Sequence, residues 1–160
     1  MQRDQSCVFC QIVAGDTPCF KIFEDADNLG FLDIFPNTEG FSVIVPKEHH
    51  RSDFSLAPEA TVTSLVKAAR QLAAKIAAAY EDVDRCAVVM EGMMIDHLHA
   101  KVIPLHRTAG EEPSPDEKHT ARGDEYFEAY PGYITTKIMS RMADQDHLAA
   151  VAGKINAAGD

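Results

Sequence analysis

In the stretch Asp96-His97-Leu98-His99-Ala100-Lys101-Val102-Ile103-Pro104, polar and apolar side chains alternate along the chain. Successive side chains of a strand point to opposite faces, so the alternation predicts a strand over 97–103 with both histidines and the lysine on one face. At the usual rise of a strand the two imidazoles start about 6.6 Å apart, close enough to serve one small site. Such a face suits the binding and attack of an anionic group such as a phosphate. The spacing leaves one alternative open, a half-buried strand whose polar face meets solvent.

The chain upstream of this stretch predicts a small antiparallel sheet and a long helix. Short apolar runs separated by turn-forming residues favour strands joined by tight connections. Apolar residues then recur with helical period from Pro58 to Tyr80, and alanine-rich spacing lets this helix lie close to a sheet. A short helix precedes the first strand and is expected to end at Gly15. The predicted strands span 20–23, 29–34, 41–45, 85–91 and 97–103.

The C-terminal third predicts a polar loop followed by one more helix. Prolines and glycines mark the loop, and an aromatic patch over 126–133 comes next. We expect this patch to contact a partner subunit; closure over the site is the alternative. The final helix is predicted over 144–157. In sum we expect one α+β domain, 1–160, with about five antiparallel strands on a long helix, a core at about 7–105, the polar loop at 107–124 and a C-terminal extension at 125–160.

The composition indicates a globular protein and argues against some partners. A hydrophobic content of 46% and a charged content of 25% exclude wholesale disorder. The net charge of -10 argues against a long nucleic acid, because such polymers are bound mainly through basic surfaces. A local cluster of histidine and lysine remains compatible with a small phosphorylated metabolite. No apolar run approaches the roughly 20 residues that cross a bilayer, and the polar N-terminus has no signal core, so we expect a cytoplasmic protein without membrane contact.

The chain has four cysteines, at positions 7, 10, 19 and 86. Because two of them are spaced as Cys-x-x-Cys and no secretory signal precedes them, we expect reduced thiols or metal ligands rather than disulfides. Cys19 and Cys86 fall in strand-like segments and are expected to be packed.

The stretch from His97 to Pro104 resembles the signature of the histidine triad (HIT) superfamily, His-φ-His-φ-His-φ-φ with φ an apolar residue. Three upstream motifs, at 7–12, 31–36 and 43–49, are similar to the N-terminal half of that family in order and spacing, so the resemblance covers about 7–105. It implies a homodimeric nucleotide-binding α+β fold. It also implies hydrolysis or transfer of a nucleoside monophosphate through a covalent nucleotidyl-histidine, on substrates such as dinucleoside polyphosphates, nucleoside phosphoramidates or related adenylates.

The resemblance also implies roles for single residues. His99 matches the nucleophile, and His97 and Lys101 match its catalytic neighbours. Asp33 matches the residue that binds ribose hydroxyls, with an ordinary turn aspartate as the alternative. The apolar wall around the base, which could equally be ordinary core, matches Val8, Phe9, Ile12, Phe31 and Ile34.

Two departures from the family pattern bear on catalysis. Lys101 replaces the third histidine and keeps a cationic donor, but with a reference pKa of about 10.4 against 6.5. Phosphate binding could survive this change, whereas leaving-group protonation would follow a different pH dependence; alternatively, Lys101 merely solvates one end of the strand. Met93 and Met94 stand where the family has polar phosphate ligands, and thioethers cannot donate hydrogen bonds. The second functional hypothesis is therefore a nucleotide-binding or regulatory protein with weak or no catalysis.

Some bacterial members of the superfamily carry a structural zinc ion. The resemblance assigns its ligands to Cys7, Cys10, His49 and His97, a closed set of two thiolates and two imidazoles that is typical of structural zinc. His50 is the neighbouring candidate if the loop shifts by one residue. A third hypothesis makes the zinc and the two-histidine strand purely structural, in a dimer or a protein-binding role.

Overall fold

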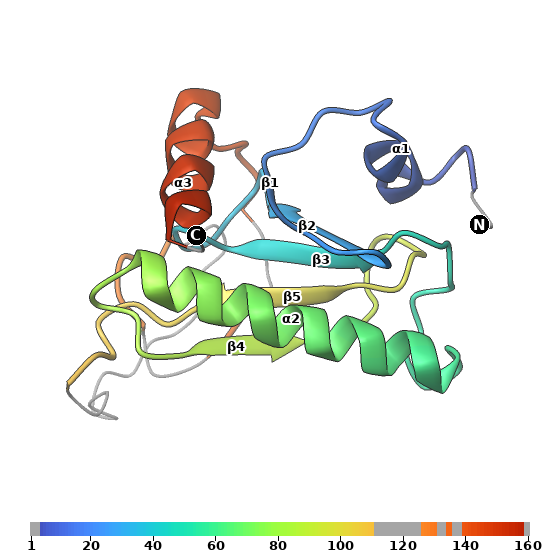
Figure 1. Ribbon diagram of the computed structural model, residues 1–160. Coiled ribbons are helices and arrows are strands. Elements are labelled where there is room, and N and C mark those ends of the chain that lie inside the picture. The colour runs from blue at the N-terminus through green and yellow to red at the C-terminus, as the bar shows by residue number, and fades with distance from the viewer. Residues whose placement is uncertain (1–3, 111–125, 131–133, 136–138, 159–160) are drawn as a thin grey trace.

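A five-stranded antiparallel sheet forms the centre of the fold (Figure 1). The computed structural model describes residues 4–110, 126–130, 134–135 and 139–158. The strands are arranged in the order β1-β2-β3-β5-β4, and each pairs antiparallel with its neighbours. The predicted α+β class with five strands and a long helix is confirmed. The strands are β1 (Lys21–Glu24), β2 (Asn28–Leu32), β3 (Ser42–Pro46), β4 (Cys86–Val89) and β5 (Ala100–Pro104).

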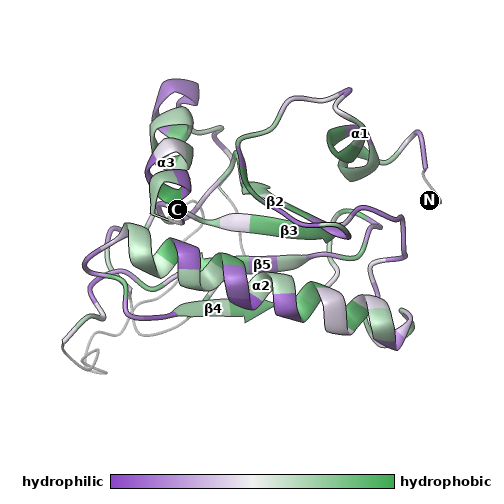
Figure 2. Ribbon diagram, viewed as in Figure 1, coloured by the Kyte–Doolittle hydropathy of each residue, from purple (hydrophilic) through white to green (hydrophobic). Residues whose placement is uncertain are grey.

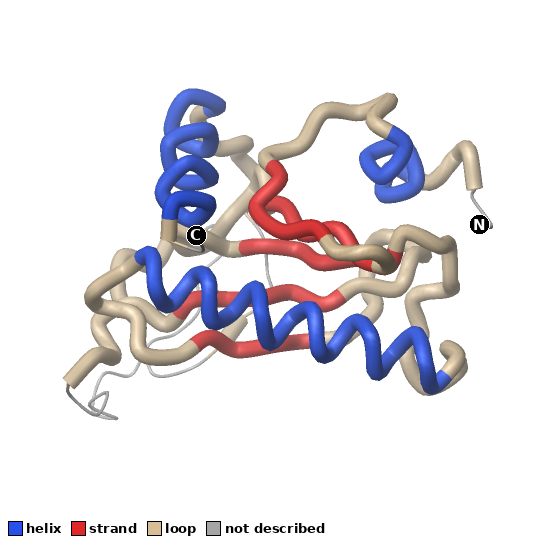
Figure 3. Tube along the Cα trace, viewed as in Figure 1, coloured by secondary structure: helices blue, strands red, loops and turns tan. Residues whose placement is uncertain are grey.

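Three helices lie within the described ranges, namely α1 (Val8–Ala14), α2 (Glu59–Ala79) and α3 (Gln145–Ala157) (Figure 3). Helix α2 runs along one face of the sheet. Asp144 caps the N-terminus of α3, because its carboxylate accepts a hydrogen bond from the backbone N–H of His147 at 2.9 Å. Figure 2 shows hydrophobic bands of α2 interrupted by hydrophilic ones, the pattern of an amphipathic helix. Among the described residues, no helix combines the length and apolarity that a membrane span requires.

The sheet separates two apolar cores, because successive residues of each strand point to opposite faces. Ile44 packs with α2 and α3 on one side, whereas Val43 and Val45 pack with Phe9 of α1 on the other. The larger core includes Leu65, Leu72 and Ile76 of α2, Leu98, Ala100 and Val102 around β5, and Leu148 and Val151 of α3.

The two histidines share the α1 side of the sheet, as the alternation predicts. The Phe9 ring centroid lies 5.8 Å from that of His97 and 5.7 Å from that of His99. The predicted strand bounds are wrong at this point, because β5 begins only at Ala100. The N–H of Leu98 donates to the carbonyl oxygen of His50 at 2.8 Å instead of joining the ladder with β3. The histidines therefore belong to a segment that leads into the strand.

The C-terminal segments fold back on their own chain. The N–H of Phe127 donates to the carbonyl of Asn37 at 2.7 Å, and that of Tyr130 donates to the carbonyl of His106 at 2.8 Å. The predicted helix over 144–157 is confirmed as α3. Residues 111–124 of the predicted polar loop, and Tyr133 of the aromatic patch, lie outside the described residues. A contact of this patch with a partner subunit stays a prediction.

Candidate active site and metal centre

The His99 imidazole is held in one tautomer by its own backbone. Its Nδ1 lies 2.7 Å from the carbonyl oxygen of His97, and a carbonyl can only accept, so Nδ1 carries the proton and Nε2 keeps its lone pair. Only 2% of His99 is exposed, and this burial lowers its pKa from the ordinary value. The charge of Lys101 lowers the pKa further. The carbonyl of His97 and the charges of Glu91 and Asp33 raise it, but the net shift is downward. The result is a neutral imidazole with a free ring nitrogen, the form that attacks phosphorus.

Lys101 is buried and forms an ion pair with Glu91. The alternative in which Lys101 solvates the end of the strand is therefore wrong, and so is a polar face turned to solvent, because His97 and His99 are buried as well. The second carboxylate oxygen of Glu91, Oε2, is buried without a hydrogen-bond partner among the described residues. Sequence reasoning missed this pair. The register of the β4–β5 hairpin could have revealed it. Val89 pairs with Lys101, and Glu91, two residues after Val89, lies on the same face.

The loop that carries Glu91 is fixed by its packing against a second loop. Gly92 has φ 67°, and a Cβ there would lie 2.6 Å from the carbonyl oxygen of Ser52, so the position requires glycine. The N–H of Ser52 donates to Oδ1 of Asp96 at 2.9 Å, which closes the other end of the loop. Met93 and Met94 are 64% and 77% exposed and therefore belong to neither core.

Asp33 lies where a turn and a cavity meet. Its Oδ1 accepts a hydrogen bond from the N–H of Phe35 at 2.7 Å, as the turn alternative expects. Burial raises the pKa of Asp33, opposed by this hydrogen bond and by the charges of Lys101 and His99. Asp33 also lines a cavity of about 580 Å³ formed with the C-terminal segment, although His99 is not among the residues of that lining.

The five predicted wall residues divide into two groups. Phe9 and Phe31 are core residues, with ring centroids 5.7 Å apart. Val8 and Ile34 remain 38% and 36% exposed, and Ile12 is half-buried, so these three have surface that a ligand could cover. Core packing and base binding therefore apply to different members of the set, and the binding roles stay predictions.

The structure brings the four predicted metal ligands together. One donor atom from each of Cys7, Cys10, His49 and His97 lies within 4.8 Å of all the others. Nδ1 of His97 is 3.5 Å from Sγ of Cys7 and 3.6 Å from Sγ of Cys10, and Nδ1 of His49 is 3.3 Å from Sγ of Cys10. Zinc bonds of about 2.3 Å to sulfur and 2.1 Å to nitrogen give tetrahedral S–N edges of about 3.6 Å. The donor set therefore fits a zinc ion.

The protonation of His97 agrees with this role. Nε2 of His97 lies 2.9 Å from the carbonyl oxygen of Pro46, which fixes the proton there and leaves the lone pair on Nδ1, toward the thiols. Burial lowers the pKa of His97 to about 4, so the ring is neutral near pH 7. His50 lies outside the cluster, with Nε2 3.4 Å from Oγ1 of Thr61.

The remaining cysteines stand apart from the cluster. Both Cys19 and Cys86 are half-buried free thiols beside the apolar cores, as expected. Burial raises the pKa of Cys86 to about 12, which makes its thiol unreactive.

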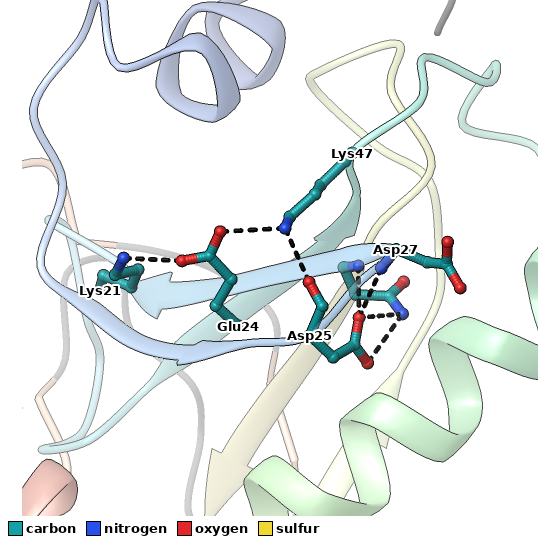
Figure 4. A network of polar contacts seen from close by, with 6 residues as sticks. Lys21, Glu24, Asp25, Asp27 and Lys47 are labelled. Atoms are coloured by element: carbon teal, nitrogen blue, oxygen red, sulfur yellow. Dashed lines mark hydrogen bonds and ion pairs between the residues drawn. The ribbon is translucent and has the colours of Figure 1, made fainter.

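A polar network that sequence reasoning missed holds the chain between Pro46 and His49 (Figure 4). Nζ of Lys47 lies 2.9 Å from Oε1 of Glu24 and donates to the carbonyl oxygen of Asp25 at 2.7 Å. The N–H of Lys47 donates to the carbonyl of Asp27 at 2.7 Å. Lys47 thereby ties the end of β3, which supplies the Pro46 carbonyl, to the β1–β2 turn.

Comparison with known proteins places this chain among related sequences and folds. The model of the HIT domain family matches residues 14–108. Adenosine 5'-monophosphoramidase hnt1 of Schizosaccharomyces pombe is 36% identical over 105 residues, which are 62% of this chain and 74% of that protein. A zinc-bound histidine triad family protein from Mycobacterium smegmatis has 27% identity and a TM-score of 0.65, over 96% of this chain and 92% of that one. A Hit-like protein from Bartonella henselae, 22% identical over 99% of both chains with a TM-score of 0.68, shares the fold.

Proposed function

This chain belongs to the HIT domain family, and from that premise we propose that it is a nucleotide hydrolase or transferase that releases a nucleoside monophosphate through a covalent intermediate on His99. The hydrogen bond from Nδ1 of His99 to the carbonyl of His97 carries this proposal, because it leaves Nε2 free and buried as a nucleophile. The monophosphoramidase from fission yeast supports a substrate with a phosphorus–nitrogen bond.

The proposed reaction has two steps. Nε2 of His99 attacks the α-phosphorus, and the bond to the leaving group breaks with its electron pair on the departing atom, which takes a proton from the Lys101 ammonium group. Water then attacks the phosphorus, the bond to Nε2 breaks, and the water proton returns to Lys101. Catalysis would depend mainly on positioning and on stabilising charge at the phosphate oxygens. We propose that Asp33 accepts hydrogen bonds from the ribose and that Val8, Phe9, Ile12, Phe31 and Ile34 form the wall at the base.

We propose a structural role for zinc at Cys7, Cys10, His49 and His97. Four protein ligands complete a tetrahedral shell, so a bound ion would cross-link the chain without an open position for substrate. It would join the start of α1 to the segment that carries the histidines, and thereby fix Phe9 against His99. We also propose a reducing, cytoplasmic location, which agrees with four cysteines that form no disulfide with one another.

We propose that the protein is a homodimer formed through β4. This strand lies at an edge of the sheet and pairs only with β5 among the described strands. Val88 on it is 43% exposed. An edge strand with an exposed β-branched residue is suited to pairing with a second copy.

One observation favours the second hypothesis, a nucleotide-binding protein with weak or no catalysis. The ammonium group of Lys101 is paired with the Glu91 carboxylate, although the proposed reaction needs this group as the proton donor to the leaving atom. Binding without turnover would then be the outcome.

The decisive experiment measures nucleoside monophosphate release from adenosine 5'-phosphoramidate, a diadenosine polyphosphate and ADP. Wild type is compared with His99→Ala and with the control Arg70→Ala, an exposed residue of α2. Release by the wild type and the control, lost in His99→Ala, supports the proposed reaction. Nucleotide binding without release from any substrate supports the second hypothesis instead.

A further inference from the structure

The Glu91–Lys101 ion pair brings a negative charge close to the candidate nucleophile. Lys101 pairs with Val43, which packs with Phe9, and the Phe9 ring also contacts His99, so Lys101 and His99 share one side of the sheet. Oε1 of Glu91 contacts the ammonium group, so the two charges offset each other. A leaving group that meets Lys101 therefore also meets a carboxylate.

The free oxygen of this carboxylate needs a donor. Oε2 of Glu91 is buried and has no partner within the described residues, and a buried acceptor without a hydrogen bond is costly. An N–H or O–H of a ligand would satisfy this oxygen. A phosphate leaving group offers only acceptor oxygens with negative charge, and these would be repelled.

The position of Glu91 is built into the loop. Gly92, the next residue, is pressed against the carbonyl of Ser52, and Ser52 is hydrogen-bonded to Asp96. These two contacts restrict movement of the backbone next to Glu91, so the carboxylate stays beside Lys101. Met93 and Met94 follow and offer no donors to an anion.

We propose that Glu91 is a specificity-determining residue that rejects anionic leaving groups and favours neutral or cationic ones that donate a hydrogen bond. This inference rests on the proposed function and assigns the selectivity of that site to a residue outside the histidine signature.

Glu91→Gln tests the inference, because glutamine keeps the shape and one acceptor oxygen but removes the charge. The first readout is the ratio of kcat/KM for adenosine 5'-phosphoramidate to that for ADP. We expect the ratio to fall by about tenfold or more in Glu91→Gln, since a like charge no longer opposes the phosphate. The matched control is Glu81→Gln, an exposed glutamate beyond the end of α2, which should keep the wild-type ratio. An unchanged ratio in Glu91→Gln, with the variant folded by circular dichroism, overturns the inference.

A binding measurement separates this inference from the proposed reaction. Calorimetry gives the affinities of AMP, which has no leaving group, and of ADP for wild type and Glu91→Gln. We expect the substitution to strengthen ADP binding about tenfold relative to AMP. If nucleotides bind without turnover, the proposed hydrolysis is wrong, but the ratio of ADP to AMP affinity still tests the role of Glu91. An affinity ratio that is the same in wild type and Glu91→Gln overturns that role. If neither nucleotide binds either protein, both proposals are wrong.

Discussion

The carbonyl oxygen of His97 accepts the Nδ1 proton of His99 at 2.7 Å, while the side chain of His97 lies in the cysteine–histidine cluster. One residue thus joins the candidate metal centre to the candidate nucleophile, through its imidazole on one side and its backbone on the other. Loss of the metal centre is therefore expected to disturb the orientation of His99 as well as the packing of α1.

Removal of zinc should destabilise the protein. A ligand that binds only the folded state adds about 4 kcal/mol when its free concentration is about 1,000 times Kd, which corresponds to about 8–16 °C in Tm for a chain of this size. We expect a strong chelator to lower Tm by that order in wild type and to have little effect in Cys10→Ser. Differential scanning calorimetry and the zinc content of the purified protein measure this.

Cys19→Ser is the control for the metal centre, because Cys19 lies outside the cluster. It should keep the zinc content and the chelator response of the wild type. The zinc assignment would be contradicted if the purified protein contained no zinc and its Tm changed with neither added zinc nor chelator.

Lys47 should act as a positioning residue for the metal centre. Lys47→Met removes the contacts of Nζ with Glu24 and Asp25, and so loosens the segment that carries the Pro46 carbonyl and His49. Loss of such outer contacts commonly weakens metal affinity by about 10–100-fold. Competition with a chromogenic chelator measures the affinity. Lys21→Met, which removes only an exposed contact with Glu24, should leave it unchanged, and equal affinities in the two variants would argue against the role.

The ligand set of the metal centre could be predicted because its residues fall within contiguous motifs of recognisable spacing. The shared side of His97 and His99 followed from strand alternation, although β5 starts later than expected. Its start depends on the bond from Leu98 to the His50 carbonyl, a contact between segments far apart in sequence that no local pattern encodes. The four predicted metal ligands lie together, whereas Glu91, which pairs with Lys101, was not predicted.

Glu91 and Lys47 escaped prediction for a common physical reason. Each contacts a partner that only the tertiary structure brings close. Glu91 contacts Lys101 across the β4–β5 connection, and Lys47 contacts the β1–β2 turn. Single charged residues near strand ends are ordinarily solvated, so only the strand register distinguishes these two from surface charges.

Acid should destabilise the protein partly through Asp82. Burial raises the pKa of Asp82, but the N–H of Arg107 and the His106 ring lower it more, so the net shift is downward. Nε2 of His106 faces the carbonyl of Glu39, so Nδ1, 3.2 Å from the Asp82 carboxylate, donates to it only in the protonated ring. A carboxyl with a lowered folded pKa adds stability above its unfolded pKa of about 3.9, and this contribution is lost as pH falls through the folded pKa. Urea unfolding of wild type and Asp82→Asn between pH 3 and 7 measures it. The difference between the two should be full near pH 5, where the His106 ring can still be protonated, and shrink below pH 4; Asp84→Asn, an exposed neighbour, should track wild type.

The dimer proposal predicts that a charge on β4 separates the subunits. Val88→Arg places a guanidinium on the half-exposed edge strand, where pairing with a second copy would bring two such charges close together. Light scattering coupled to size exclusion should report twice the chain mass of 17.5 kDa for wild type and close to the chain mass for the variant. Ala150→Arg, at an exposed position of α3, which contacts β1 at the opposite edge of the sheet, should remain a dimer. If the wild type elutes at the mass of one chain, the dimer proposal is wrong. If Val88→Arg is still a dimer, the interface lies on a surface other than β4.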